Sequence, residues 1–267
     1  MTPALKAVHV PPNWRRIAFA SDIHLSAHDA ETAARWHHAL AALQADALFL
    51  LGDYFDFWVG DDALDAPVTT GPDGETLAFW QSCVRALHAT AQRLPVYWMV
   101  GNRDFLAGER FAQATGVHRL QDPCCLHWAQ DTYLLSHGDT WCTDDLAYMA
   151  FRKQVRSADW QQGFLQQSLA QRLAVARGMR KTSQARQQNM PAIADVHADA
   201  VNQSAAAHQA TAVIHGHTHQ GRSFALPSGR ARHVTLDWDA PAARAQWLWL
   251  TPEGLKRVDW PGNETRG

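Results

Sequence analysis

Short apolar runs alternate with longer amphipathic stretches along the first half of the chain. Three runs, at 17–20, 47–51 and 96–100, have the length of strands, and the stretches at about 29–44 and 75–93 have the length of helices. Two more apolar runs follow, at 132–135 and 212–214. Short β-like runs at 232–238, 245–250 and 255–260 come last, separated by Pro and Gly. This order predicts a layered α/β structure that antiparallel strands complete.

Each of the five apolar runs ends in a polar turn that is rich in Asp, Asn or His. The turns are 21–24, Gly52-Asp53, Gly101-Asn102-Arg103-Asp104, Ser136-His137-Gly138-Asp139 and 215–219. In open α/β sheets, binding sites collect where the carboxyl ends of the strands meet. The sequence therefore predicts that these five turns converge on a single site.

The segment 151–190 differs from the rest of the chain in charge and periodicity. It contains eight Lys or Arg and one acidic residue, whereas the formal net charge of the whole chain is -2. Its apolar residues recur at helical spacing, which predicts one or two amphipathic helices inserted between the fourth and fifth strands. Two interpretations stay open. One is a surface helix pair with a solvated basic face, and the other is a cap that offers cations to an anionic ligand and apolar surface to a lipid or a membrane.

Composition narrows the class of protein. With 46% hydrophobic and 19% charged residues, the chain is expected to be globular and not disordered. The net charge of -2 argues against a general nucleic-acid binder. The four Cys show neither the CxxC pairs of a zinc site nor the density of a disulfide framework, which favours a reduced cytoplasmic setting. The longest strongly apolar stretch, 45–51, is too short to span a bilayer, so any membrane association is expected to be peripheral.

The residue types in the five turns are those of a metal site. A metal pair that cleaves a phosphate ester or anhydride needs oxygen donors, imidazoles and a carboxylate that bridges ions roughly 3.5–4 Å apart. Residues two apart in extended chain face the same side, so Asp22 and His24 can reach one ion, and the same holds for His215 and His217. Ligands without thiolate suit Mn²⁺, with Fe, Zn and Mg open. A water shared by two cations can attack phosphorus, so no Ser or Cys nucleophile is required.

The order of the motifs, D-x-H, G-D, G-N-x-D, H-G-D and G-H-x-H, resembles that of the calcineurin-like metallophosphoesterase family over 22–219. The resemblance implies a four-layer αββα sandwich formed by 14–145 and 191–262, with a helical cap insertion at 146–190. It also implies two metal ions per chain, with Mn²⁺ as the first choice. The ligands would be Asp22, His24 and His217 for one ion, Asn102, His137 and His215 for the other, and Asp53 as the bridge. His219 would lie just beyond this set.

One position departs from the family pattern. Where the family has His after Gly-Asn, this chain has Arg103. The change removes an imidazole acid and supplies a cation that can grip a phosphoryl group through two hydrogen bonds. A substrate with several phosphates would benefit most, and Asn102, Arg103 and His137 are the expected catalytic residues. Asp56 and Asp104 are expected to orient neighbouring ligands or backbone.

Longer motifs at 52–62, 101–105 and 137–148 are similar to those of one branch of the family, which hydrolyses the pyrophosphate of UDP-2,3-diacylglucosamine in lipid A synthesis. The resemblance implies the products UMP and 2,3-diacylglucosamine 1-phosphate (lipid X), attack at the α-phosphorus, and a peripheral place on the cytoplasmic side of the bacterial inner membrane. An apolar, cationic cap suits two acyl chains and a diphosphate. Carried over by position, the substrate contacts would be Asn102, Arg103, Asp145, Tyr148, Arg180, Ser183, Gln187 and His215.

Other interpretations stay open. A family member that acts on another nucleotide, a cyclic nucleotide or a dinucleoside polyphosphate, would keep the metal ligands but have no use for an apolar cap. A non-catalytic scaffold would be expected to have lost ligands, and all seven are present. A nuclease would need a basic groove for a long polyanion, whereas the basic excess here is confined to one short segment. Tyr148 and Arg180 could instead have no substrate role, with their side chains used for plain helix packing or, for a charged group, exposed to solvent.

Overall fold

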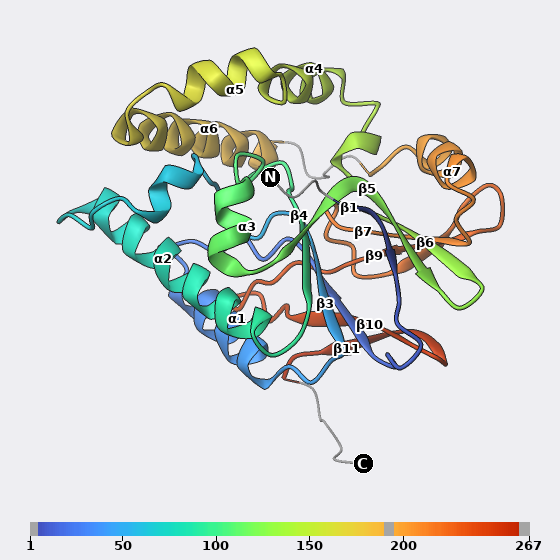
Figure 1. Cartoon of the computed structure of the whole chain (residues 1–267). Coiled ribbons are helices and arrows are strands. Elements are labelled where there is room, and N and C mark those ends of the chain that lie inside the picture. The colour runs from blue at the N-terminus through green and yellow to red at the C-terminus, as the bar shows by residue number, and fades with distance from the viewer. Residues whose placement is uncertain (1–4, 190–194, 262–267) are drawn as a thin grey trace.

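The computed structural model describes residues 5–189 and 195–261, without the side chains of residue 5 and of 181–189. Its strands form one hydrogen-bonded sheet that folds back on itself (Figure 1). In the first half, β2 (Ile17–Ala20), β3 (Ala47–Leu51) and β4 (Val96–Met99) are parallel. The antiparallel pair of β10 (Gln246–Thr251) and β11 (Gly254–Asp259) continues from β2, as the sequence predicts for this part of the chain.

The long strand β5 (His118–Trp128) connects the two halves of the sheet. Its start pairs with β4, and its end pairs with β6 (Asp131–Ser136) and with β1 (Leu5–His9). Beyond β6 come β7 (Ala212–His215), β9 (Ala231–Val234) and β8 (Ser223–Ala225). The expectation of an antiparallel strand at 232–238 holds on one side only, because β9 is antiparallel to the short β8 but parallel to β7.

The two halves of the sheet pack face to face around an apolar core. Every residue of β2 is buried, and its side chains alternate between two sides. Ile17 and Phe19 face the second half, where they share a core with Leu135 and Ile214. Positions 18 and 20 face the helices on the other side. A strand that is buried on both faces explains why 17–20 is a continuous apolar run without a polar position.

Helices cover the outer face of each half. In Figure 1, α1 (Ala30–Ala42), α2 (Pro72–Ala91) and α3 (Glu109–Thr115) lie on one side and α7 (Ala198–Ala207) on the other. Asp29 caps α1 by accepting a hydrogen bond from Thr32 N at 3.0 Å. In the core of the second half, Val201 of α7 shares an apolar cluster with Leu134 and Val213. The layers helix, sheet, sheet and helix confirm the predicted αββα sandwich.

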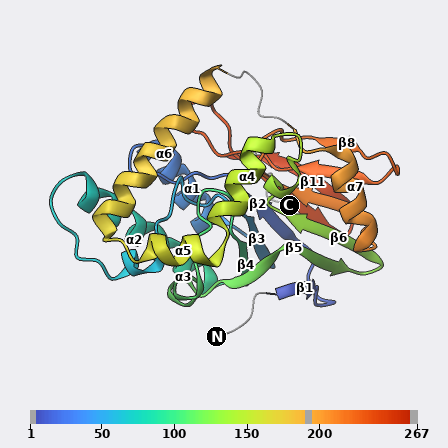
Figure 2. The same ribbon diagram turned by 90° about the horizontal axis from the view of Figure 1, so that it is seen from above.

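Residues 146–189 form three helices that lie across one end of the sheet (Figures 1 and 2). They are α4 (Leu146–Val155), α5 (Ala158–Leu165) and α6 (Leu169–Asn189), and we call them the cap. The sequence predicts one or two helices, but Ser157 accepts a hydrogen bond from Trp160 N and Ser168 accepts one from Gln171 N, so a new helix begins after each serine. Across the described ranges, no helix combines the length and the apolar character that a membrane span requires.

Ion pairs fasten the cap to the core. The pairs are Arg152 with Asp139, Arg172 with Asp62, Arg177 with Asp73 and Arg180 with Asp56. Arg172 is only 2% exposed and also donates to Val59 O at 2.5 Å. A buried arginine of this kind must be paired, which explains the acid that faces it. These four arginines are thus paired with acids of the core, and a solvated basic face does not describe them.

We expect Trp36→Ala to lower the free energy of unfolding by about 3–5 kcal/mol, because it leaves a cavity where α1 packs on the sheet. Trp36 is fully buried, and its ring centroid lies 4.6 Å from that of Trp238 and 5.3 Å from that of Trp247. Urea unfolding would measure the change. Val68→Ala is the control, since Val68 is 51% exposed and its replacement should cost at most about 0.5 kcal/mol. Equal losses in the two variants would contradict this packing.

Candidate metal centre

The turns that the sequence predicts to converge do lie together at the ends of their strands. Hydrogen bonds connect the first two turns, because Asp22 N donates to Gly52 O and His24 N donates to Asp53 O, both at 3.0 Å. The third turn joins them through Arg103 N, which donates to Asp53 Oδ1 at 2.9 Å. The turn after β7 joins through the backbone N–H of residue 217, which donates to Asp22 Oδ2 at 2.9 Å.

The backbone of this region is strained at five positions. The φ angle is 54° at Asp22, 51° at His24, 53° at Asp53, 68° at His217 and 53° at His219. Residues other than glycine adopt positive φ uncommonly, and such strain persists only where the surroundings enforce it. Here the buried strands and the hydrogen bonds between turns enforce it. Strain of this kind at the end of several strands is typical of a functional site.

Two glycines permit the close approach of the turns. A Cβ at Gly101 would lie 2.0 Å from Asp53 Oδ1, which is far inside van der Waals contact. A Cβ at Gly52, where φ is +91°, would lie 2.5 Å from His137 Nδ1. Sterics therefore explain why the G-D and G-N motifs have glycine at these two positions. They let one turn pass directly against the ligands of the next.

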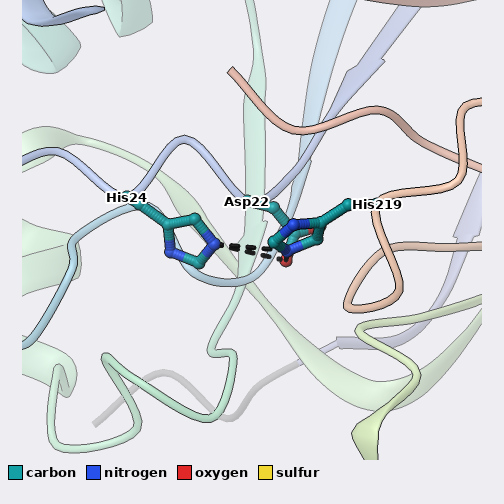
Figure 3. Close-up of side chains that lie close together, drawn as sticks. All are labelled: Asp22, His24 and His219. Carbon is teal, nitrogen blue, oxygen red and sulfur yellow. Dashed lines mark hydrogen bonds and ion pairs between the residues drawn. The ribbon is translucent and has the colours of Figure 1, made fainter. Parts of the chain in front are cut away.

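One group of side chains consists of Asp22, His24 and His219 (Figure 3). His219 Nε2 lies 3.2 Å from Asp22 Oδ1 and 3.3 Å from His24 Nε2. The other ring nitrogen of His219 lies 3.5 Å from Asp237 Oδ2, and Arg244 in turn binds Asp237 at 2.7 Å. A carboxylate behind an imidazole fixes its orientation and its tautomer, as is usual for metal-binding histidines.

A second group consists of Asp53, His137, Asn102 and His217. Asn102 Oδ1 lies 2.9 Å from both His137 Nε2 and His217 Nδ1. Asp53 Oδ1 lies 3.7 Å from His137 Nε2, and Asp53 Oδ2 lies 3.9 Å from His24 Nδ1. Asp53 therefore faces both groups with different oxygens, which is the position expected of a bridging carboxylate.

The residues in the two groups fit divalent metal ions. His24 Nδ1 is buried and has no hydrogen-bond partner among the described residues. A buried polar atom without a partner costs free energy, and a metal ion could serve as its partner. The donors are carboxylate oxygens, an amide oxygen and imidazole nitrogens, without a thiolate. This set suits Mn²⁺, Fe²⁺ or Zn²⁺.

Protons balance the buried charge of the metal-free cluster. Burial lowers the pKa of His137, but Asp53 and Asp22 outweigh this effect and raise the pKa to about 9. Burial likewise lowers the pKa of His219, but Asp22 and Asp237 raise it to about 10. Burial raises the pKa of Asp53 to about 7 against the opposing effect of His137. The cluster thus retains protons where cations would otherwise neutralise its carboxylates.

The structure corrects the predicted grouping of the histidines. His219 stands beside Asp22 in the place predicted for His217, and His217 stands beside Asn102 in the place predicted for His215. The predicted grouping came from the family resemblance, with the motif G-H-x-H placed on His215 and His217, but His215 ends β7 and it is His217 that follows a glycine, Gly216. The spacing G-H-x-H, read from the glycine directly after β7, was the signal that could have identified the right pair.

His215 lies outside both groups. Its side chain is fully buried, Nδ1 lies 2.8 Å from Gly216 O, and its ring meets that of Trp141 edge-on with centroids 5.7 Å apart. No hydrogen bond or ion pair among the described residues joins its ring to the other predicted ligands. Burial lowers the pKa of His215 to about 4, so the ring is neutral. Its Nε2, like Nδ1 of His24, is buried without a hydrogen-bond partner among the described residues, but no contact joins the ring to either group, so the metal role and the substrate contact of His215 stay predictions.

Two predicted substrate contacts, Arg103 and Arg180, meet beside the cluster. Arg103 Nη1 donates to Asp56 Oδ1 at 2.9 Å, and Arg103 Nε lies 3.6 Å from Asp53 Oδ2. Arg180 of α6 binds the other oxygen of Asp56, and it donates to Ser26 Oγ at 3.3 Å. The structure thus brings one arginine of the core and one of the cap to the same edge of the candidate metal centre.

The remaining predicted contacts lie along the cap. Asp145 caps α4 by accepting from Tyr148 N at 2.9 Å. The Tyr148 hydroxyl donates to Asp139 Oδ2 at 2.7 Å, and its ring centroid lies 5.9 Å from that of His217. Ser183 and Gln187 belong to the backbone of α6, but their side chains are outside the described residues.

A buried carboxylate, Asp104, joins the second and third turns. It accepts hydrogen bonds from Gly101 N at 2.7 Å and from Tyr54 N at 2.8 Å. Its side chain is fully buried, and both of these hydrogen bonds come from backbone N–H groups of residues that are not predicted metal ligands. Asp104 therefore orients backbone, as the sequence predicts for it.

Comparison with known proteins places these features in a family. The model of the calcineurin-like phosphoesterase family matches residues 15–221, which include both groups of side chains and the cap. UDP-2,3-diacylglucosamine hydrolase of Bordetella pertussis is 40% identical over 258 residues, covering 93% of this chain and 95% of its own. The protein of that name from Chromobacterium violaceum is 37% identical over 251 residues, covering 91% and 98%. Its counterpart from Stenotrophomonas maltophilia is 39% identical over 233 residues, covering 82% and 90%.

We expect His219→Gln to weaken Mn²⁺ binding by at least about tenfold, because it removes a ring nitrogen that faces Asp22 and His24. His215→Gln is the matched control and should leave Mn²⁺ binding within about threefold of the unchanged protein. Metal content after gel filtration and competition with a chelator would measure both. Equal losses, or a greater loss in the His215 variant, would restore the grouping predicted from the sequence.

We expect the metal-free protein to release protons when it binds Mn²⁺, and the apparent affinity to fall as the pH drops from about 9 through about 7. His137 and His219 must lose a proton to become ligands, and Asp53 must do so below pH 7. Each displaced proton should cost about tenfold in affinity per pH unit. Isothermal titration calorimetry in buffers of different ionisation enthalpy counts the protons. Affinity that is constant over this range would contradict the charge balance described above.

Proposed function

The chain belongs to the calcineurin-like phosphoesterase family of metal-dependent hydrolases, and we propose that it hydrolyses the pyrophosphate bond of UDP-2,3-diacylglucosamine. The products would be UMP and 2,3-diacylglucosamine 1-phosphate, a step of lipid A synthesis. One observation carries the proposal. Relatives named UDP-2,3-diacylglucosamine hydrolase match 93% of the chain, too much for the match to omit the cap helices. The cap is thus shared with these relatives along with the candidate metal centre.

We propose that two Mn²⁺ ions bind in the groups described above. Asp22, His24 and His219 would hold one ion, Asn102, His137 and His217 the other, and Asp53 would lie between them. Two divalent ions would supply positive charge to the phosphoryl oxygens and a water of lowered pKa as nucleophile. The strained, hydrogen-bonded turns hold the ligands in place before any metal arrives. This rigidity favours two ions at a fixed separation.

The side chains of the protein bind and orient the diphosphate. Arg103 faces the metal centre from the loop after β4, and Arg180 faces it from the cap, so both guanidinium groups can bind phosphoryl oxygens. Positive charge at these places offsets the charge that develops on the diphosphate as the bond breaks. The leaving group at the α-phosphorus is a sugar phosphate, which is a weak base. A strong general acid is therefore not required, consistent with Arg103 in place of an imidazole.

The apolar side chains of the cap suit a lipid substrate. Among the large apolar side chains that are exposed in the described part of the chain, most lie on the cap: Leu146, Phe151, Leu165, Val175 and Met179. Soluble proteins seldom gather such side chains on one segment without a binding role. We propose that they contact the acyl chains and the surface of the cytoplasmic membrane, with the protein as a peripheral protein on the cytoplasmic side of the inner membrane and without a nucleic-acid partner.

We expect the Mn²⁺-loaded protein to hydrolyse UDP-2,3-diacylglucosamine, and in ¹⁸O-water to place the label in UMP, because attack is at the α-phosphorus. Mass spectrometry of the two products gives this result directly. The matched control substrate is the deacylated UDP-sugar, which should turn over at least about tenfold less efficiently because it cannot use the apolar cap. Faster hydrolysis of a cyclic nucleotide or a dinucleoside polyphosphate would refute the substrate, and label in the lipid phosphate would refute the point of attack.

A further inference from the structure

Asp56 binds an arginine with each of its two carboxylate oxygens. It follows the bridging residue Asp53 by three positions in the loop after β3 and is only 5% exposed. Oδ1 accepts from Arg103 Nη1 at 2.9 Å, and Oδ2 accepts from Arg180 Nη1. One arginine belongs to the core and the other to α6 of the cap. The carboxylate therefore connects the core to a helix of the cap, and its partner in that helix lies 124 positions later in the chain.

We propose that Asp56 is a positioning residue that assembles Arg103 and Arg180 into a single clamp for the diphosphate of the substrate. The inference rests on the proposed function, because it assumes that the two arginines bind phosphoryl oxygens. Asp56 itself does not contact the substrate in this scheme. It sets where the two guanidinium groups stand and how far apart they are.

The charges explain why a carboxylate is needed at this place. Two guanidinium groups side by side repel each other, and the repulsion is strongest where water is partly excluded. One carboxylate between them offsets the repulsion and fixes each planar group through a charge-assisted hydrogen bond. The described contacts of Arg103 and Arg180 leave the Nη2 group of each arginine without a protein partner. These donors remain for an anion that approaches from the metal centre.

Asp139 also pairs with two arginines, but both of them, Arg152 and Arg156, come from the same end of the cap. Two further ion pairs of the cap have another arrangement. Arg177 pairs with Asp73 at the rim, where both side chains are more than a third exposed. Arg172 pairs with Asp62 beneath the cap, away from the predicted metal ligands. Neither pair includes a second arginine from the core. The position of α6 and the orientation of Arg103 are therefore coupled through Asp56, so docking of the cap and formation of the clamp occur together.

Asp56→Asn tests this role because it keeps the shape of the side chain but removes its charge. We expect the affinity of the Mn²⁺-loaded protein for UDP, a soluble diphosphate, to fall about 10- to 100-fold in calorimetry, since misplacing binding groups by about 1 Å can have effects of this size. Metal content and the melting temperature should stay close to those of the unchanged protein. KM for UDP-2,3-diacylglucosamine should rise more than kcat falls. Asp73→Asn is the matched control, since it removes a charge partner from another cap arginine, and it should change none of these values.

Two further variants separate positioning from simple loss of structure. Asp56→Glu keeps the charge and should recover part of the lost UDP affinity, whereas a purely structural role for the aspartate would not be rescued. In an Arg180→Gln background, Asp56→Asn should cost much less than it does alone, because one of the two groups it positions is already missing. Additive effects of Asp56→Asn and Arg180→Gln would overturn the proposal.

The binding measurement also distinguishes the clamp from the proposed function. If the unchanged protein did not hydrolyse UDP-2,3-diacylglucosamine, the proposed substrate would be refuted, yet UDP binding would still report on the clamp. UDP that binds no more tightly than uridine to the unchanged protein would overturn the clamp. Tighter UDP binding by the Asp56→Asn variant would also overturn it, because Asp56 would then compete with the phosphates for the arginines instead of positioning them.

Discussion

Two carboxylates, Asp22 and Asp53, are fully buried where the central strands of the sheet end, and a buried carboxylate needs positive charge close by. Most features of the site follow from this need. The imidazoles of His137 and His219 face the carboxylates and hold protons in the metal-free protein. Glycines in the adjacent turns let these side chains approach, and the backbone accepts positive φ to aim them. Divalent ions would replace the protons and neutralise the same carboxylates.

The cap depends on charge in a second way. Read from the sequence, 151–190 is a basic segment whose charge is available to a ligand or a membrane. In the structure, four of its eight basic residues, Arg152, Arg172, Arg177 and Arg180, bind aspartates of the core and so hold the cap in place. The charge left for a diphosphate comes from the two arginines that share Asp56. A small number of well-placed donors thus replaces a general basic surface, which suits a short anion better than a long polyanion.

The sequence predicts the parts of this site that depend on local order. Strands read from 17–20, 47–51 and 96–100 are β2, β3 and β4, and Asp22, Asp53 and His137 converge as expected. The predicted histidines differ by two positions from those that the structure groups, because the motif G-H-x-H was placed on His215, the last residue of β7, and not on His217, which follows Gly216. The sequence also does not show which distant segments contact each other. Nothing near Arg180 in the sequence indicates that its partner is an aspartate 124 positions earlier.

The candidate metal centre and the cap differ in a way that bears on which substrate the protein would select. The proposed metal ligands sit on short turns at the ends of buried strands. The cap is an insertion that packs on the core through a few ion pairs and presents exposed apolar side chains. A phosphoryl group offers the metal centre the same oxygens in every nucleotide substrate, so the centre alone cannot distinguish an acylated sugar from a bare one. In the proposed function that distinction would come from the cap, and Asp56 would align the cap with the reacting phosphate by binding Arg103 and Arg180.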